Sequence, residues 1–337
     1  MNHIFFSHSN ICTIAAFKTI KELIEKGDNV IIILNRGTKF PFFEGKVRIF
    51  DIQYITDEYR KSSSNVIGKY LNYRFHYLPQ FDEIAKEIIG EEEFILYAPS
   101  YNLFILRYFF NSSYLKGYYY LEEGTLSYTS KKLLLRRYYK KIFLKGRLVS
   151  GLFGLREYFD YKVTKKFKGC ICLSDQAFQW LSYNKTISTI DDYLYALDEP
   201  PLIVDALIVT GYLNEDILEL YKGLDSIFAQ IRLKNQKSVA VKFHPTAASY
   251  QREKCEQIKT YLTSKYTNTE ILFVNTSYSL EGSLYQRKTD LYSIFGMSSL
   301  CLYSLIFGSR SYVINRETPK EINEVSSVEN FMYRANA

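Results

Sequence analysis

Three short segments of the chain place charged or hydroxyl side chains at the ends of apolar runs. The first is Tyr120-Leu121-Glu122-Glu123-Gly124-Thr125, in which two adjacent carboxylates and a glycine follow an apolar stretch. Repulsion between neighbouring carboxylates raises the pKa of one of them, which suits a general base. The alternative is an ordinary acidic turn, which is common on protein surfaces.

The second segment is Val239-Ala240-Val241-Lys242-Phe243-His244-Pro245, a β-branched run that ends in a lysine and a histidine. Side chains alternate along a strand, so Lys242 and His244 are predicted to point to the same side, and Pro245 then ends the pairing. Two such donors at the carboxyl end of a strand would suit an anionic ligand. The alternative is a single histidine that caps a strand end.

The third segment, residues 291–299, is Leu-Tyr-Ser-Ile-Phe-Gly-Met-Ser-Ser, and a helical pattern follows over residues 300–307. A buried strand, a glycine turn and the Ser298-Ser299 pair at a helix start would direct backbone N–H groups and hydroxyls at one anion. This is the arrangement of a phosphate site. The alternative is that Ser298 only caps the helix.

Common metal and cofactor signatures are absent from the sequence. It contains no G-x-G-x-x-G, no G-x-x-x-x-G-K-[ST] and no D-x-D motif, so dinucleotide, P-loop and metal-nucleotide interpretations lack support. The histidines and cysteines do not have the spacing of zinc ligands. We therefore expect no metal and no cofactor. The cysteines, odd in number and scattered, are predicted to be buried thiols in a reducing compartment; they are Cys12, Cys170, Cys172, Cys255 and Cys301.

The order of apolar runs predicts an α/β protein with two domains, for which 337 residues suffice. Strand-like runs at Asn2–Ser7 and Asn29–Leu34 flank a helical pattern, Ile14–Lys26, that stops at Gly27. This is a βαβ unit, and the pattern restarts after Pro200-Pro201. Further strands are predicted at Val47–Phe50, Phe94–Tyr97, Tyr118–Leu121, Leu202–Val209, Ser238–Phe243, Ile271–Val274, Leu291–Ile294 and Ser311–Ile314, and helices at Glu215–Ile231 and Gln251–Tyr261.

This pattern predicts two Rossmann-like domains, residues 1–198 and 199–337, that face a central cleft in the glycosyltransferase-B arrangement. The net charge of +7 favours anionic partners. The stretch Lys131–Arg147 has eight Lys or Arg and no acid, and on a helix it would have one apolar and one basic side. It predicts contact with an anionic membrane surface or ligand, the alternative being a solvated basic face.

No apolar run approaches the roughly 18 residues of a membrane span, and the first residues lack the pattern of a signal peptide. We therefore expect a cytoplasmic protein, peripheral on the inner face of the plasma membrane if Lys131–Arg147 binds lipid.

Taken in order, the three segments resemble the bacterial sialyltransferases, including the lipooligosaccharide sialyltransferases and polysialyltransferases. The family pattern is [DE]-[DE]-G, then H-P, then a pair of [ST]. The resemblance runs from the first strand to about residue 315, but its motifs occupy only a few dozen residues. Gly211, after the first strand of the second half, and Glu281, ahead of the serine pair, agree with it. The loop Ser7-His8-Ser9-Asn10 matches loosely.

The resemblance implies an inverting, metal-independent transfer of sialic acid from CMP-sialic acid to a sugar hydroxyl of a bacterial surface glycan: lipopolysaccharide, lipooligosaccharide or capsule. The first domain would bind acceptor and sialic acid, and the second would bind CMP. Glu123 would be the base, with Glu122 tuning it or replacing it, and His244 would stabilise the leaving phosphate. The donor-binding residues would be Ser9, Asn10, Thr125, Gly211, Lys242, His244, Pro245, Glu281, Ser298 and Ser299. The motifs leave the acceptor sugar, the linkage and the oligomeric state open.

Two other functions are compatible with parts of the sequence. A glycosyltransferase of the same fold could use CMP-Kdo or a nucleoside diphosphate sugar, and a preference for CMP over UDP or GDP would discriminate. A basic nucleic-acid-binding or membrane-surface protein without catalysis would rest on charge and aromatic content alone. No RNA-binding or zinc-finger motif accompanies the charge, so we expect no nucleic-acid partner.

Overall fold

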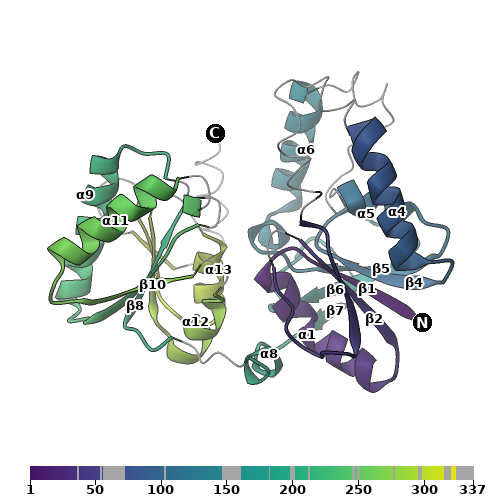
Figure 1. Cartoon of the computed structure of the whole chain (residues 1–337), viewed down its shortest axis with the longest axis horizontal. Coiled ribbons are helices and arrows are strands. Elements are labelled where there is room, and N and C mark those ends of the chain that lie inside the picture. Colours follow the sequence, from purple (N-terminus) through teal and green to yellow (C-terminus); the bar gives the residue numbers. More distant parts are fainter. Residues whose placement is uncertain are drawn as a thin grey trace. The chain divides into compact units, whose positions relative to one another are not determined.

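A computed structural model of the chain shows two compact units, Met1–Ala196 and Leu197–Ala337 (Figure 1). The sequence places the boundary between residues 198 and 199. Each unit is a sheet with helices on its faces, and each is described here by itself. The residues that the structure describes are 1–35, 38–53, 55, 73–101, 104–145, 161–181, 183–197, 202–211, 213–244, 247–248, 251–275, 278–294, 298–314 and 320–323.

The first unit contains a seven-stranded parallel sheet in the order β3-β2-β1-β4-β5-β6-β7. The chain moves outward from β1 to one edge, returns to place β4 beside β1, and then moves to the other edge. This doubly wound order is Rossmann-like and gathers ligand sites at the carboxyl ends of the strands. The strands are β1 Asn2–Ser7, β2 Asn29–Leu34, β3 Val47–Asp51, β4 Phe94–Ala98, β5 Leu115–Leu121, β6 Phe167–Cys172 and β7 Lys185–Ile187.

Helices pack against this sheet because its central strands are buried toward both faces. All six residues of β1 are buried, and Ile4 and Phe6 share one core with Phe81 of α4 and Phe109 of α5. A sheet buried in this way needs a helix layer on each face. The helices are α1 Asn10–Glu25, α4 Leu78–Ile89, α5 Phe104–Asn111, α6 Lys131–Lys145 and α8 Asp191–Tyr195, with a π-helical turn η1 at Tyr73–Tyr77 and a 3-10 helix η2 at Thr125–Tyr128.

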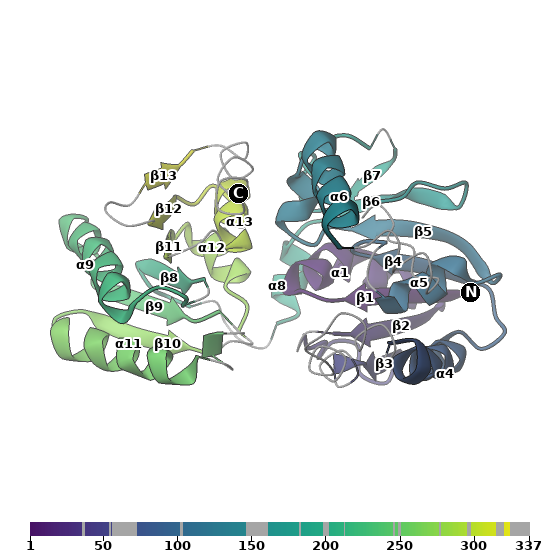
Figure 2. The ribbon, with the colours of Figure 1, turned by 90° about the horizontal axis from the view of Figure 1, so that it is seen from above.

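The second unit repeats this plan with six strands in the order β10-β9-β8-β11-β12-β13, of which only β13 is antiparallel to its neighbour. Helices α9 and α11 cover one face, and α12 and α13 cover the other (Figure 2). The strands are β8 Ala206–Thr210, β9 Ser238–Lys242, β10 Glu270–Val274, β11 Asp290–Ile294, β12 Ser311–Ile314 and β13 Lys320–Ile322; the helices are α9 Ile217–Leu233, α11 Arg252–Lys265, α12 Glu281–Arg287 and α13 Ser299–Ile306.

The predicted strands and helices are present in the structure, but several of them begin or end at other residues than predicted. The strand predicted at Leu202–Val209 is wrong over its first four residues. There the Leu202 N–H donates to Ser283 Oγ rather than to a strand, and β8 begins at Ala206. The helix predicted from Ile14 begins at Asn10, because the Ser9 side chain caps it. The strands β6, β7 and β13 were not predicted.

The basic stretch Lys131–Arg147 is helical over its described part, α6. Leu134 is buried and Arg136 is exposed, as the predicted apolar and basic sides require, whereas Tyr139, which was predicted on the apolar side, is exposed. Residues 146–147 and the Pro200-Pro201 pair lie outside the described residues. The role of α6 at an anionic surface stays a prediction. Within the described ranges, no helix combines the length and the apolar character that crossing a bilayer requires.

Candidate functional site

The predicted acidic pair lies at the carboxyl edge of the first sheet. Strand β5 ends at Leu121, and the chain then turns sharply at Gly124, whose φ of 118° favours glycine. The Glu123 N–H donates to Ser127 Oγ (3.1 Å), which closes the turn over the helix η2. The turn therefore holds Glu122 and Glu123 at the strand end.

Glu122 is fully buried, and both of its carboxylate oxygens accept hydrogen bonds from other residues of the protein. Its Oε2 accepts a hydrogen bond from the Leu173 N–H (2.7 Å), and its Oε1 accepts one from the Tyr128 hydroxyl (2.8 Å). Burial, and then the charge of Glu122, raise the pKa of Tyr128, so that hydroxyl stays a donor. Glu122 thus ties the end of β5 to the end of β6 and to η2.

Glu123 lies among different groups. Its side chain is 6% exposed, and its Oε2 is 3.8 Å from Nδ1 of His8, whose side chain is 8% exposed. Its Oε1 accepts a hydrogen bond from the Tyr161 hydroxyl (3.2 Å). Burial raises the pKa of the neighbouring Cys12 to about 12, and the charge of Glu123 adds to that rise. The carboxylate therefore sits beside an imidazole and a neutral thiol.

The other predicted residues of this unit adjoin the same edge. Ser9 is the N-cap of α1, and its Oγ accepts from the Cys12 N–H (3.3 Å). Asn10 is the first residue of α1, and Thr125 is the first residue of η2. The sequence prediction did not select His8. The available signal was its position directly after the first strand, within a loop of small polar residues.

In the second unit, Lys242 is the last residue of β9. Its Nζ donates to the backbone oxygen of Tyr278 (2.5 Å), in the loop before α12. Burial lowers the pKa of Lys242, and the nearby charge of Glu281 opposes that fall. Glu281 is itself buried, and its Oε2 accepts from the Ser279 hydroxyl (2.7 Å). These contacts place the predicted Lys242 and Glu281 together.

His244 follows β9 and is bound to the end of the neighbouring strand. Its backbone N–H donates to Thr210 Oγ1 (3.2 Å) at the end of β8. The Gly211 N–H in turn donates to the oxygen of Ile294 (3.0 Å) at the end of β11. The carboxyl ends of three adjacent strands are therefore linked where the sequence predicted an anion site.

The paired serines stand at the start of α13 at this edge. Ser298 is the N-cap, and its Oγ accepts from the Leu300 N–H (3.2 Å). Its own N–H donates to Ser293 Oγ (3.3 Å), and Ser299 is exposed. Ser298 therefore does cap the helix. Because it caps as an acceptor, its hydroxyl proton can still be donated to a ligand. Pro245 and residues 295–297 lie outside the described residues.

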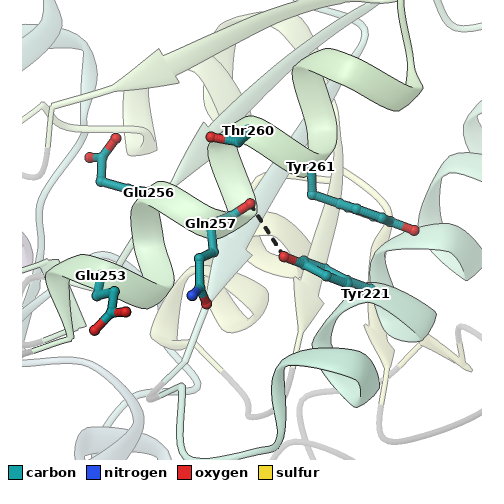
Figure 3. A pocket seen from close by; sticks show the side chains of 6 residues that line it. All are labelled: Tyr221, Glu253, Glu256, Gln257, Thr260 and Tyr261. Atoms are coloured by element: carbon teal, nitrogen blue, oxygen red, sulfur yellow. Dashed lines mark hydrogen bonds between the residues drawn. The ribbon is translucent and has the colours of Figure 1, made fainter.

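A hollow of about 460 Å³ lies elsewhere, on the outer helices α9 and α11 (Figure 3). The rings of Tyr221 and Tyr261 stack there with centroids 3.8 Å apart, and Glu253 and Glu256 line it. All of its lining residues come from these two helices, so it does not include the predicted site residues.

The cysteine prediction is confirmed as far as burial is concerned. All five cysteines are buried free thiols. In the part of the chain that the structure describes, no three His, Cys, Asp or Glu side chains gather in a group that could hold a metal ion.

Comparison with known proteins gives structural likeness only. No protein-family model matches the chain, and no curated protein sequence matches it. Staphylococcus aureus MnaA, solved with UDP, has a TM-score of 0.50 at 11% identity and covers 99% of this chain and 86% of its own. A protein from Listeria monocytogenes, provisionally named UDP-N-acetylglucosamine 2-epimerase, has a TM-score of 0.51 at 10% identity. The alignment covers 98% of this chain and 82% of the Listeria chain.

Escherichia coli heptosyltransferase WaaC, solved with ADP-2-deoxy-2-fluoro heptose, aligns over 100% of both chains at 11% identity, with a TM-score of 0.46. Together with the strand orders of the two sheets, the two structures with TM-scores of 0.50 and 0.51 show that the chain has the glycosyltransferase-B fold. The predicted fold class of two Rossmann-like domains is thereby confirmed. At 10–11% identity the likeness to these two structures shows the fold and does not assign a substrate.

Proposed function

We propose that the chain is a sialyltransferase that moves sialic acid from CMP-sialic acid to a hydroxyl of a bacterial surface glycan, with inversion and without a metal. The observation that carries the proposal is the sorting of charge between the sheet edges. Glu123 lies at the edge of the first sheet, and Lys242 and His244 lie at that of the second. The fold supports the general part of the proposal, which is a glycosyltransferase with a nucleotide-sugar donor and a glycan acceptor.

In the proposed reaction, the acceptor hydroxyl gives its proton to the Glu123 carboxylate as its oxygen attacks the anomeric carbon. The bond from that carbon to the phosphate oxygen breaks, and its electron pair leaves with CMP. Lys242, His244 and the hydroxyl of Ser298 would stabilise the charge that develops on the phosphate. Donors fixed before the reaction are usually a large term in catalysis.

The remaining predicted residues have binding roles in this proposal. The carboxylate of sialic acid would lie near Ser9 and Asn10 at the start of α1, where the helix dipole favours an anion, and near Thr125. Glu281 would accept hydrogen bonds from the ribose hydroxyls. Gly211 has no side chain to obstruct the nucleotide.

A nucleoside diphosphate sugar enzyme is the second candidate. It is favoured by the two structures with the higher TM-scores, which are MnaA solved with UDP and the Listeria protein named as an epimerase of a UDP-sugar. A transferase that uses CMP-Kdo is a closer alternative, because it shares the CMP group.

The experiment that tests the proposal is an acceptor screen with CMP-sialic acid, with linkage analysis of the product. CMP, UDP and GDP are titrated in parallel by calorimetry, each with magnesium and with EDTA. We expect CMP to bind more tightly than either diphosphate, and EDTA to leave turnover nearly unchanged. Transfer from CMP-Kdo alone would exclude sialic acid. Binding of UDP in place of CMP would favour the second candidate, and CMP binding that requires magnesium would contradict the metal-free step.

A further inference from the structure

His8 is a buried imidazole beside the proposed base, and the proposed reaction assigns it no role. It follows the last residue of β1, whereas Glu123 follows β5, and these two strands flank β4 in the sheet. Nδ1 of His8 lies 3.8 Å from Oε2 of Glu123, and both side chains are less than a tenth exposed. A histidine and a carboxylate so enclosed influence each other's charge strongly, because little water screens them.

The two oxygens of Glu123 have different neighbours. The Tyr161 hydroxyl donates to Oε1 (3.2 Å), and the imidazole faces Oε2. A carboxylate with a hydrogen bond on one oxygen and an imidazole at ion-pair distance from the other has a preferred orientation, which sets the direction in which it meets an acceptor hydroxyl. Positioning of this kind is worth much of a catalytic group's effect.

We propose that His8 is a positioning residue for Glu123: its Nδ1–H side holds the buried carboxylate charged and oriented for the acceptor. The inference rests on the proposed function, because a base is needed at this edge only if an acceptor loses a proton. Burial by itself favours the neutral acid, and a neighbouring donor or imidazolium favours the carboxylate. His8 therefore offsets the burial of Glu123.

The other titratable groups around the pair do not supply a positive charge that would hold Glu123 in its charged form. Cys12 of α1 is a neutral thiol. Tyr161 binds Glu123 through an uncharged hydroxyl. Glu122 would oppose a second negative charge, but its oxygens accept from Leu173 and Tyr128.

Three substitutions of His8 separate positioning from packing. The amide nitrogen of Asn is as many bonds from Cα as Nδ1 is, so His8→Asn keeps a donor toward Glu123. The amide nitrogen of Gln corresponds to Nε2, and Ala has no donor. We expect His8→Gln and His8→Ala to lose about 10–100-fold in kcat, the effect of removing one polar neighbour from a buried charged group. His8→Asn should recover most of that loss, and KM for CMP-sialic acid should stay unchanged in all three.

The pH profile is a second readout that a packing role would not move. Without the donor, Glu123 takes up a proton more readily, so the acid limb of kcat should move to higher pH in His8→Gln and His8→Ala but not in His8→Asn. Thermal unfolding of each variant measures the packing cost separately. Equal losses of kcat in all three variants, with unchanged pH profiles, would overturn the proposal, and so would full activity in His8→Ala.

The pairing can also be measured without activity. The ring protons of His8 are followed by NMR through a pH titration of the wild type and of Glu123→Gln. Removal of the carboxylate charge should lower the midpoint of the His8 ring by about 1 pH unit or more. An unchanged midpoint would overturn the pairing even in an active enzyme. Failure of the wild type to use CMP-sialic acid would instead overturn the proposed function, and a shifted midpoint would still support the pair.

Discussion

The two sheets share a doubly wound plan, but their carboxyl edges carry different chemistry. The edge of the first sheet presents Glu123 and His8, whereas that of the second presents Lys242, His244 and the cap of α13. The central strands β1 and β8 are fully buried. The plan of the sheet therefore determines where polar groups gather, and the residues just past each strand determine which charge a ligand meets there.

The same lesson applies within one turn, to two neighbouring glutamates. Glu122 has both oxygens bonded to the protein. Glu123 faces an imidazole and a tyrosine hydroxyl. We expect the first to hold the edge together and the second to do chemistry.

The largest expected effect is that of Glu123→Gln. The substitution keeps the shape of the side chain and removes the base, so turnover should fall about 10²–10⁴-fold, the usual contribution of a positioned general base. The fall should appear in kcat rather than in donor affinity, and CMP binding should survive. Steady-state kinetics and calorimetry measure the two. Near-normal turnover in this variant would show that Glu123 is not the general base.

Glu122→Gln is the matched partner of that variant. An amide is uncharged and accepts through its oxygen only, so the Leu173 N–H can keep its partner, whereas the bond from the Tyr128 hydroxyl to a charged oxygen is lost or reversed. The free energy of unfolding should fall by about 1.5–3 kcal/mol, as for a hydrogen bond to a charged group, whereas Glu123→Gln should unfold nearly like the wild type. Denaturant unfolding checks both. A stable but inactive Glu122→Gln, beside an active Glu123→Gln, would reverse the two assignments.

At the edge of the second sheet, the double variant Ser298→Ala with Ser299→Ala should weaken CMP binding. Each lost hydrogen bond to a charged phosphate is worth about 1.5–3 kcal/mol, and loss of the cap should also cost about 1 kcal/mol of stability. Ser299→Ala alone keeps the cap and serves as the control in calorimetry. If the double variant loses stability but binds CMP like the wild type, the serines only begin a helix.

The smallest expected effect concerns pH and Lys242. Burial lowers its pKa below the ordinary 10.5. Only the protonated form attracts a phosphate, so CMP affinity should decline as pH rises through that lowered pKa. Lys242→Arg stays charged at every accessible pH and should not show the decline. Calorimetry of both proteins from neutral to alkaline pH compares them, and parallel curves would exclude Lys242 as a phosphate ligand.

Much of the fold follows from local signals in the sequence. The strands β1, β2 and β12 have the predicted bounds, because continuous apolar runs bounded by polar residues specify buried parallel strands. Gly27, predicted to end a helix, has a φ of 79°. The strand β6 was missed because a lysine and a glycine interrupt its apolar run, and β7 has only three residues.

The sequence by itself determined the doubly wound class and the order of the acidic, His-Pro and serine segments. Only the tertiary structure decided which glutamate the protein uses for itself. Leu173 lies 51 residues from Glu122 along the chain, yet its N–H occupies that carboxylate, and His8 meets Glu123 from a different strand end. A parallel sheet brings distant strand ends to one edge, so the partners of an edge residue follow from strand order and not from its neighbours in sequence.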